Sequence, residues 1–139
     1  MNRFVSSTQV LILWGHGCNE AIAAGCVATF RQQGANVTLV GLSGRRNMGA
    51  HGLTLQPDVL LSDALPLADL ADLVIFPCSE VTAAALDTDP RLRDLCQRAA
   101  VNGASFILYD PAIGTLLGLD EHQTHLFNFD LDPFSLLNN

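Results

Sequence analysis

Two of the four cysteines stand where a thiol could act as a nucleophile. Cys78 follows the apolar run 73–76 and directly precedes Ser79, a residue that can cap the N-terminus of a helix. A thiol at a helix N-terminus is stabilised as the thiolate, which is the nucleophilic form. Cys78 is therefore the first candidate nucleophile of a cysteine-dependent enzyme, and Cys18 is the second. Free cysteine is also among the most buried residue types, so a buried thiol without a chemical role is the competing interpretation.

A tyrosine and an aspartate stand where another predicted strand meets a predicted helix. The apolar run 106–109 ends at Tyr109, which Asp110 and Pro111 follow. Ligands gather at such corners of an open α/β sheet, so Asp110 could be a pocket carboxylate and Tyr109 could donate a hydrogen bond to a ligand. Asp89 also precedes a proline at the start of a predicted helix, which favours a capping role for Asp110. For Tyr109 we expect a side chain that fills the space beside the corner.

The remaining motifs do not predict a metal site or a cofactor. His122 and His125, with Glu121, have the spacing of a helical metal site, but two imidazoles without a third ligand more often mark a polar surface turn. The segment 15–17 is Gly-His-Gly, and the third glycine of a dinucleotide motif is replaced by Glu20. The chain contains no lysine, which excludes a P-loop and Schiff-base chemistry.

Composition predicts one domain over residues 1–139 that binds neither nucleic acid nor membranes. Of the 139 residues 49% are hydrophobic, enough for a sizeable core, and the net charge is -7, which repels phosphate backbones and anionic lipids. The first apolar run, 10–14, is too short for a signal peptide or a membrane span. The cysteines form no CxxC pair, which favours reduced thiols and a cytoplasmic location.

The hydrophobic pattern predicts alternating strands and helices, and so an α/β domain with a mainly parallel sheet. Strands are expected at 10–14, 36–41, 73–76 and 106–109, and helices at 20–33, 79–86 and 90–102, with a short helical segment after Pro57 and another helix after 109. The glycine-rich stretch 41–56 is predicted to be an excursion with an edge strand at 53–55. The tail 119–139 is left unassigned beyond an extended segment near 126–129.

The order of these segments resembles the DJ-1/PfpI superfamily over roughly residues 9 to 120. The matching segments are Val10-Leu-Ile-Leu, Gly34-Ala-Asn-Val-Thr-Leu-Val-Gly-Leu, Leu53-Thr-Leu-Gln-Pro-Asp58, Leu61-Ser-Asp63 and Asp72-Leu-Val-Ile-Phe-Pro77, followed by 92–100. Their order, rather than any single motif, carries the resemblance. It implies a flavodoxin-like three-layer sandwich related to class I glutamine amidotransferase domains.

The resemblance also implies a site that this sequence does not preserve. Members have a cysteine, a small residue and a glycine at the strand-to-helix elbow, where this chain has Tyr-Asp-Pro at 109–111. Proline disfavours the strained backbone of a nucleophile elbow, so we expect a relaxed corner. The family's acidic partner lies at the start of the first helix, where Glu20 is the acid within reach. Cys78 and Ser79 replace the glycine pair that supplies oxyanion N–H groups.

The replaced elbow predicts a catalytically silent domain that acts as a small-molecule-binding, regulatory or assembly module. Its pocket is expected at the loops that follow the strands ending near Trp14, Phe76 and Tyr109. The residues expected to line it are His16, Glu20, Cys78, Ser79, Tyr109 and Asp110. The alternative is a cysteine-dependent hydrolase or a small-aldehyde-processing enzyme that uses Cys78 or Cys18, with Glu20 as the acidic candidate.

The resemblance further implies a homodimer, since members are commonly dimers. Trp14, the His-Gly turn after it and the phenylalanines of the tail are expected to supply the apolar surface. A small-molecule ligand or a protein partner is the further expectation.

Overall fold

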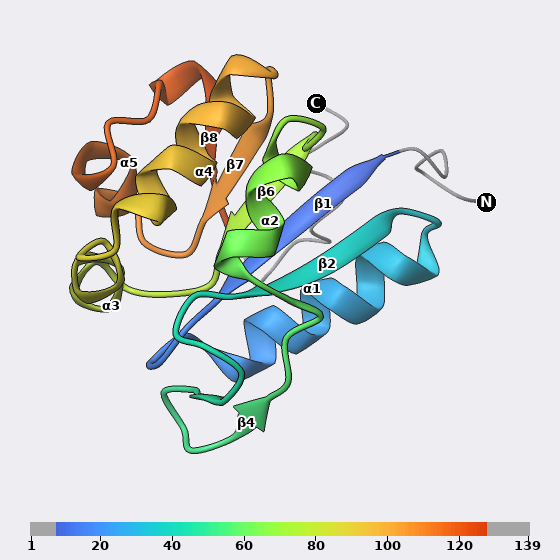
Figure 1. Ribbon diagram of the computed structural model, residues 1–139, viewed down its shortest axis with the longest axis vertical. Coiled ribbons are helices and arrows are strands. Elements are labelled where there is room, and N and C mark those ends of the chain that lie inside the picture. Colours follow the sequence, from blue (N-terminus) through green and yellow to red (C-terminus); the bar gives the residue numbers. More distant parts are fainter. Residues whose placement is uncertain (1–7, 128–139) are drawn as a thin grey trace.

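A six-stranded parallel sheet forms the centre of the protein. The structure is a computed structural model that describes residues 8–127. The strands of the sheet are β1 (Gln9–Trp14), β2 (Asn36–Gly41), β5 (Val59–Leu60), β6 (Leu73–Phe76), β7 (Ser105–Leu108) and β8 (Thr124–Leu126). Their spatial order is β5-β2-β1-β6-β7-β8, and each neighbouring pair is parallel (Figure 1). The carboxyl ends of all these strands therefore lie at one edge of the sheet.

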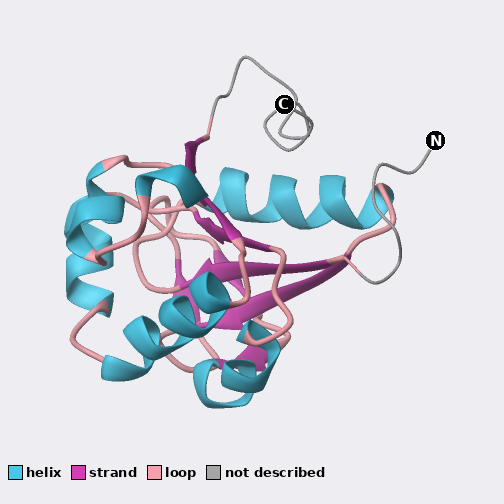
Figure 2. Ribbon diagram, turned by 90° about the horizontal axis from the view of Figure 1, so that it is seen from above, coloured by secondary structure: helices cyan, strands magenta, loops and turns pink. Residues whose placement is uncertain are grey.

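Helices cover both faces of the sheet. They are α1 (Glu20–Gln32), α2 (Leu61–Ala68), α3 (Glu80–Leu86), α4 (Pro90–Val101) and α5 (Ala112–Leu116). The chain moves from β1 to β2 in one direction and from β5 through β6 and β7 to β8 in the other, so right-handed crossovers place α1 on one face and the later helices on the opposite face. Figure 2 shows the long helix on one side of the strands, shorter helices on the opposite side, and further helical segments at one end of the sheet. The predicted flavodoxin-like, three-layer α/β fold is confirmed.

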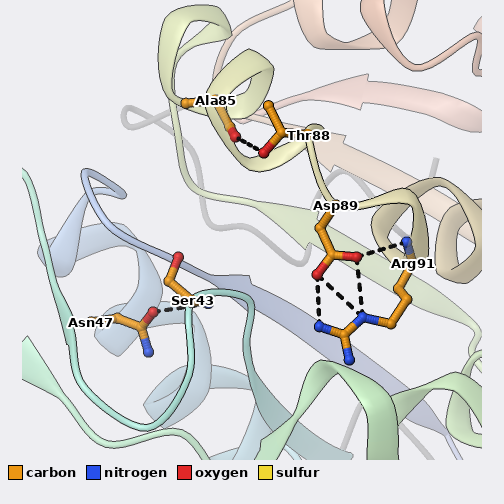
Figure 3. Close-up of polar contacts among 6 residues, drawn as sticks. All are labelled: Ser43, Asn47, Ala85, Thr88, Asp89 and Arg91. Carbon is orange, nitrogen blue, oxygen red and sulfur yellow. Dashed lines mark hydrogen bonds and ion pairs between the residues drawn. The ribbon is translucent and has the colours of Figure 1, made fainter.

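The glycine-rich excursion folds as an antiparallel hairpin beside the main sheet. Its strands are β3 (Asn47–Met48) and β4 (Thr54–Leu55), and we call the segment from Asn47 to Leu55 the hairpin. Asn47 is fully buried at its base, where Oδ1 accepts from the Ser43 N–H at 3.1 Å (Figure 3). Its Nδ2 donates to the Gly44 carbonyl at 2.7 Å. This amide replaces backbone partners that the short loop lacks.

Capping residues set the starts of the helices, at Ser79 and Asp89 as the sequence predicted and at Asn19 in addition. Ser79 caps α3 through a hydrogen bond from the Thr82 N–H, and Asn19 caps α1 through one from the Ile22 N–H. Asp89 accepts from the Arg91 N–H at the start of α4 and also pairs with the Arg91 guanidinium (Figure 3). Each cap stabilises its helix by about 1 kcal/mol.

The core lies between the sheet and its helices, and it includes a residue that we expected at the surface. All of β6 and nearly all of β1 are buried, as is typical of central parallel strands. Trp14 ends β1 and is 0% exposed. The expectation that Trp14 supplies apolar surface for a partner is therefore wrong, because β1 is the central strand and the loops at its end cover the ring.

The predicted elements agree with the structure except at short or glycine-rich segments. The strands at 36–41 and 73–76 and the helices that begin after Ser79 and Asp89 are confirmed. The pattern missed β5, which has only Val59 and Leu60. A strand does form in the tail, but it is β8, slightly earlier than expected. Residues 128 and 129 of the expected segment, and Phe134, lie outside the described residues.

Candidate functional site

The loops after β1, β6 and β7 are neighbours at the carboxyl edge of the sheet. The Asn19 N–H donates to the Pro77 carbonyl at 2.6 Å, which ties the loop after β1 to the loop after β6. The Tyr109 N–H donates to the Phe76 carbonyl at 3.1 Å, which ties the end of β7 to the end of β6. The segments that we expected to share a site are therefore in direct contact.

Cys18 and Cys78 lie together at this edge. The two side chains share a hydrogen bond, and the Cys18 sulfur also accepts from the Gly15 N–H at 3.3 Å. Both residues are buried, with exposed fractions of 0% for Cys18 and 2% for Cys78. The sequence singled out both residues but gave no indication that their thiols touch.

The electrostatics reverse the order of the two cysteine candidates. Two hydrogen bonds, first the one with Cys78 and then the one from the Gly15 N–H, lower the pKa of Cys18. Burial raises this pKa by less, so the pKa lies below its ordinary value. The same shared hydrogen bond raises the pKa of Cys78, as do burial and the negative charges of Cys18 and Asp110. Cys18 rather than Cys78 is therefore the thiol that the site stabilises as a thiolate.

Glu20 lies at the start of α1, but its carboxylate is bound to the hairpin. Oε2 accepts from the backbone N–H groups of His51 and Leu53 at 2.8 and 3.0 Å, and Oε1 lies 2.9 Å from the His51 ring nitrogen Nδ1. Only 3% of Glu20 is exposed, and a Cβ at Gly49 would lie 2.4 Å from its side chain. The sequence analysis missed these partners, for which the only signal was the glycine-rich composition of the segment that follows β2.

The hydrogen bonds keep this carboxylate ionised. Burial raises the pKa of Glu20. The hydrogen bonds from the Leu53 N–H and from the backbone and side chain of His51 outweigh this effect and lower the pKa to about 2. A carboxylate saturated by donors in this way holds the hairpin against α1. It is not placed as an acid or base beside a thiol, because its accepting oxygens face the hairpin.

Asp110 and Ser79 are bound to helix starts at the same edge. The Asp110 carboxylate accepts from the Ala112 N–H at 3.0 Å, before α5, and from the Glu80 N–H at 2.8 Å, at the first residue of α3. The Ser79 hydroxyl accepts from the Thr82 N–H at 3.4 Å. The structure thus agrees with the capping role expected for Asp110.

Tyr109 is more exposed than a side chain that fills the space beside the corner would be. It follows Leu108, the last buried residue of β7, and is 39% exposed, so the expectation of a buried aromatic is wrong. No residue other than glycine has a positive φ among residues 8–127, so Tyr109 lacks the strained backbone of a nucleophile elbow. The corner is relaxed, as the proline at 111 predicted.

His16 joins the loop after β1 to the hairpin. Its ring nitrogen Nδ1 accepts from the Met48 N–H at 3.2 Å, and the neighbouring Gly17 N–H donates to the Met48 carbonyl at 3.0 Å. The Ala50 N–H donates to the Cys18 carbonyl at 2.8 Å. The hairpin therefore lies over the loop that carries Cys18.

Two hollows lie along the outer side of α1, where the hairpin approaches it. One has a volume of about 400 Å³, and its lining residues include Ala24, Val27 and Leu55. The other has a volume of about 320 Å³ and is lined chiefly by Ala21, Ala24, Leu53 and Leu55, with Glu20 and His51 at one side. Arg31, Gln56 and Asp58 add polar groups to the first hollow, whereas the second is mainly apolar, and neither Cys18 nor Cys78 lines either of them. Sequence analysis did not predict these hollows.

The histidines of the tail do not assemble a metal site. Among residues 8–127, no three side chains of His, Cys, Asp or Glu are grouped to hold an ion. Glu121 and His122 lie in a short 3₁₀ helix (Glu121–Gln123), and His125 lies in β8. None of the helices in the described part of the chain is long and apolar enough to cross a membrane.

The arrangement of the sheet and its helices matches known structures. Toxoplasma gondii DJ-1 in an oxidised form superposes with a TM-score of 0.71 and 19% identity over 80% of this chain. Drosophila melanogaster DJ-1beta gives a TM-score of 0.71 and 20% identity over 81% of this chain. This is the DJ-1/PfpI fold. A two-domain Anabaena variabilis protein with DJ-1/ThiJ/PfpI-like and ferritin-like domains gives a TM-score of 0.63 and 20% identity over 73% of this chain.

The DJ-1/PfpI likeness covers only part of those proteins. The chain spans 61% of the length of each of the two DJ-1 structures and 29% of the two-domain protein. No family model and no curated protein matches the sequence. At these identities the likeness establishes the fold.

Proposed function

We propose that this chain is a DJ-1/PfpI superfamily member without elbow chemistry, and that it acts as an assembly module by forming a homodimer through α1 and the hairpin. The single observation that carries the loss of chemistry is the corner after β7. There Tyr109 has ordinary backbone geometry and Asp110 is bound to the starts of two helices. A nucleophile elbow depends on backbone strain and free donors, which this corner does not offer.

The apolar surface beside α1 supports self-association. Leu53 is 62% exposed at the tip of the hairpin, and Leu55, Val27, Ala24 and Ala21 continue the apolar surface onto the helix. Monomeric proteins rarely leave such a contiguous apolar surface open. A hollow lined by small alanine side chains accepts a leucine from a partner of the same shape, as a two-fold contact requires.

Charge favours a second copy as the occupant of this surface. The chain has a net charge of -7, so two copies repel one another over most of their surface. The charged side chains along the hollows already have partners within the chain. Arg31 forms an ion pair with Asp58 at 2.9 Å, and the Glu20 carboxylate is hydrogen-bonded to the hairpin. This is where two acidic chains can approach with little electrostatic cost.

Light scattering after size exclusion tests the assembly. The parent chain should elute with twice the chain mass of 14.9 kDa at tens of micromolar, and Leu53→Asp should elute as a monomer because it places a charge in the apolar contact. Val101→Asp is the matched control, since Val101 is 91% exposed at the end of α4, away from this surface, and this variant should stay dimeric. A monomeric parent, or a Leu53→Asp variant that is still dimeric, contradicts the proposal.

A cysteine-dependent hydrolase or small-aldehyde-processing enzyme is the second candidate, and one observation favours it. The lowered pKa of Cys18 gives a more nucleophilic thiol than an ordinary buried cysteine. Burial of Cys18 and the raised pKa of Cys78 weigh against it. Hydrolysis of an ester or consumption of a small aldehyde that Cys18→Ala abolishes would support the enzyme over the assembly module. The four free cysteines support a reducing, cytoplasmic location for either function.

A further inference from the structure

The pair formed by Cys18 and Cys78 is held by backbone geometry. β1 and β6 are adjacent parallel strands with Ile12 opposite Ile75, so the loops that follow them start side by side. The Asn19 N–H then bonds to the Pro77 carbonyl at 2.6 Å. Cys18 is the residue before this donor and Cys78 is the residue after this acceptor, so the two thiols lie within hydrogen-bonding reach of each other.

The two sulfurs have complementary chemical roles. The Cys18 sulfur accepts from the Gly15 N–H at 3.3 Å and lies 4.0 Å from the Leu13 carbonyl, to which it donates when protonated, and its hydrogen bond with Cys78 lowers its pKa. The same hydrogen bond, burial and the negative charges of Cys18 and Asp110 raise the pKa of Cys78, which therefore keeps its proton. One thiol is thus prepared for attack, and the other stands next to it as a resolving thiol. Cys26 and Cys96, by contrast, are buried in the apolar faces of α1 and α4.

We propose that Cys18 and Cys78 are a redox-active dithiol that a hydroperoxide converts into an intramolecular disulfide. The Cys18 thiolate attacks the terminal peroxide oxygen, the O–O bond breaks, and the leaving oxygen takes up a proton to depart as water or an alcohol. This leaves a sulfenic acid on Cys18. The Cys78 thiol attacks that sulfur, the S–O bond breaks, and a water molecule leaves as the disulfide forms. The two thiols lose two electrons in total, and the peroxide gains them.

The hairpin controls access to the pair. The Ala50 N–H bonds to the Cys18 carbonyl at 2.8 Å, and the Gly17 N–H bonds to the Met48 carbonyl at 3.0 Å, so both ends of the Cys18 loop are covered. Glu20 in turn holds the hairpin through His51 and Leu53. A peroxide therefore reaches Cys18 when the hairpin lifts, and weakening the hold of Glu20 should accelerate oxidation.

Peroxide titration with thiol mapping tests the pair. The reduced full chain is treated with hydrogen peroxide or tert-butyl hydroperoxide, denatured, alkylated and digested for mass spectrometry. We expect a peptide linked through Cys18 and Cys78 that has lost the mass of two hydrogen atoms and returns to two alkylated thiols after dithiothreitol. Cys26 and Cys96, whose pKa burial raises to about 12, should oxidise at least about tenfold more slowly.

Variants separate the two steps. Cys78→Ala should stop at a Cys18 sulfenic acid that dimedone traps, whereas Cys18→Ala should give neither dimedone adduct nor disulfide. Cys96→Ala is the matched control and should form the disulfide as the parent does, and circular dichroism checks that each variant is folded. Two results in the unsubstituted parent chain overturn the proposal. One is that Cys18 and Cys78 oxidise no faster than Cys26, and the other is that Cys18 forms a sulfinic acid without any peptide linked to Cys78.

Discussion

At the scale of single residues, Glu20 differs most from the role that the family resemblance implied for it. An acid at the start of the first helix suggests a partner for a catalytic thiol, but here the carboxylate is occupied by hydrogen bonds from the hairpin. The sequence distance of 31 residues between Glu20 and His51 explains why no local pattern indicated this contact. Long-range partners of a buried charge become evident only in the folded chain.

The bond between Glu20 and the hairpin predicts a pH dependence. The pKa of Glu20 lies at about 2 in the folded chain, against an ordinary value of 4.5. A lowered pKa stabilises the docked hairpin fully above pH 4.5, and this stabilisation is lost as the pH falls from there to about 2. Amide hydrogen exchange at His51 and Leu53 should therefore lose protection in this range. Glu20→Gln should show weaker protection at pH 7 and little further loss in acid, and identical acid profiles for the two proteins would contradict this role.

The exposure of Tyr109 predicts that the corner tolerates substitution. Tyr109→Cys should change the free energy of unfolding by less than about 1 kcal/mol, because surface changes cost little, whereas truncation of a buried aromatic costs about 3–5 kcal/mol. The new cysteine should give no hydrolytic activity, since the backbone at 109 is unstrained and Pro111 follows. Chemical denaturation of Tyr109→Cys and Tyr109→Phe measures this, and a loss of several kcal/mol in the cysteine variant would restore the buried side chain we first expected.

At the scale of elements, the contact between the hairpin and α1 can be tested with two glycines. Gly49→Ala places a Cβ 2.4 Å from the Glu20 side chain, so it should lower the free energy of unfolding by about 1–3 kcal/mol. Gly25→Ala is the matched control, because its Cβ meets no heavy atom within 4 Å in the middle of α1. It should raise the free energy of unfolding by about 0.5–1 kcal/mol through helix propensity. Equal denaturation midpoints for Gly49→Ala and the parent would show that Glu20 is not fixed against the hairpin.

The elements that sequence predicted well are those whose signals are local. Apolar runs marked β1, β2 and β6, and Ser79 and Asp89 marked helix starts through bonds that span two or three residues. β5 was missed because a strand of two residues has no measurable alternation. The exposure of Tyr109 was misjudged because Tyr109 is the first residue after β7. Whether such a residue is buried depends on where the strand ends in the sheet, which a local pattern does not show.

The candidate site was predictable only in its parts. Strand ends identified Cys18, Cys78 and Asp110 as neighbours of one sheet edge, since parallel strands bring their carboxyl ends together. The shared hydrogen bond of the thiols and the reversal of their pKa values depend on side-chain directions that a pattern does not contain. The apolar hollows beside α1 arise from the packing of a hairpin that sequence analysis treated as an excursion.

At the scale of the whole molecule, the DJ-1/PfpI fold is present, but the carboxylates and thiols at its carboxyl edge are engaged in contacts within the chain. Asp110 fixes helix starts, Glu20 fixes the hairpin, and the thiols lie beneath the loops. The hollows lined by α1 and the hairpin are mainly apolar. We propose that a second copy of the chain covers this surface and that function depends on that contact.

Hydrogen exchange measured at two protein concentrations tests this claim most directly. The parent chain is labelled at a concentration where light scattering gives a monomer and again at one where it gives a dimer, with Leu53→Asp as the control. The account predicts that protection increases with concentration at α1 and at residues 51–55, and that it stays unchanged at α4 and in every segment of Leu53→Asp. Protection that does not depend on concentration, or that increases around Tyr109 and α3 instead, would contradict the account.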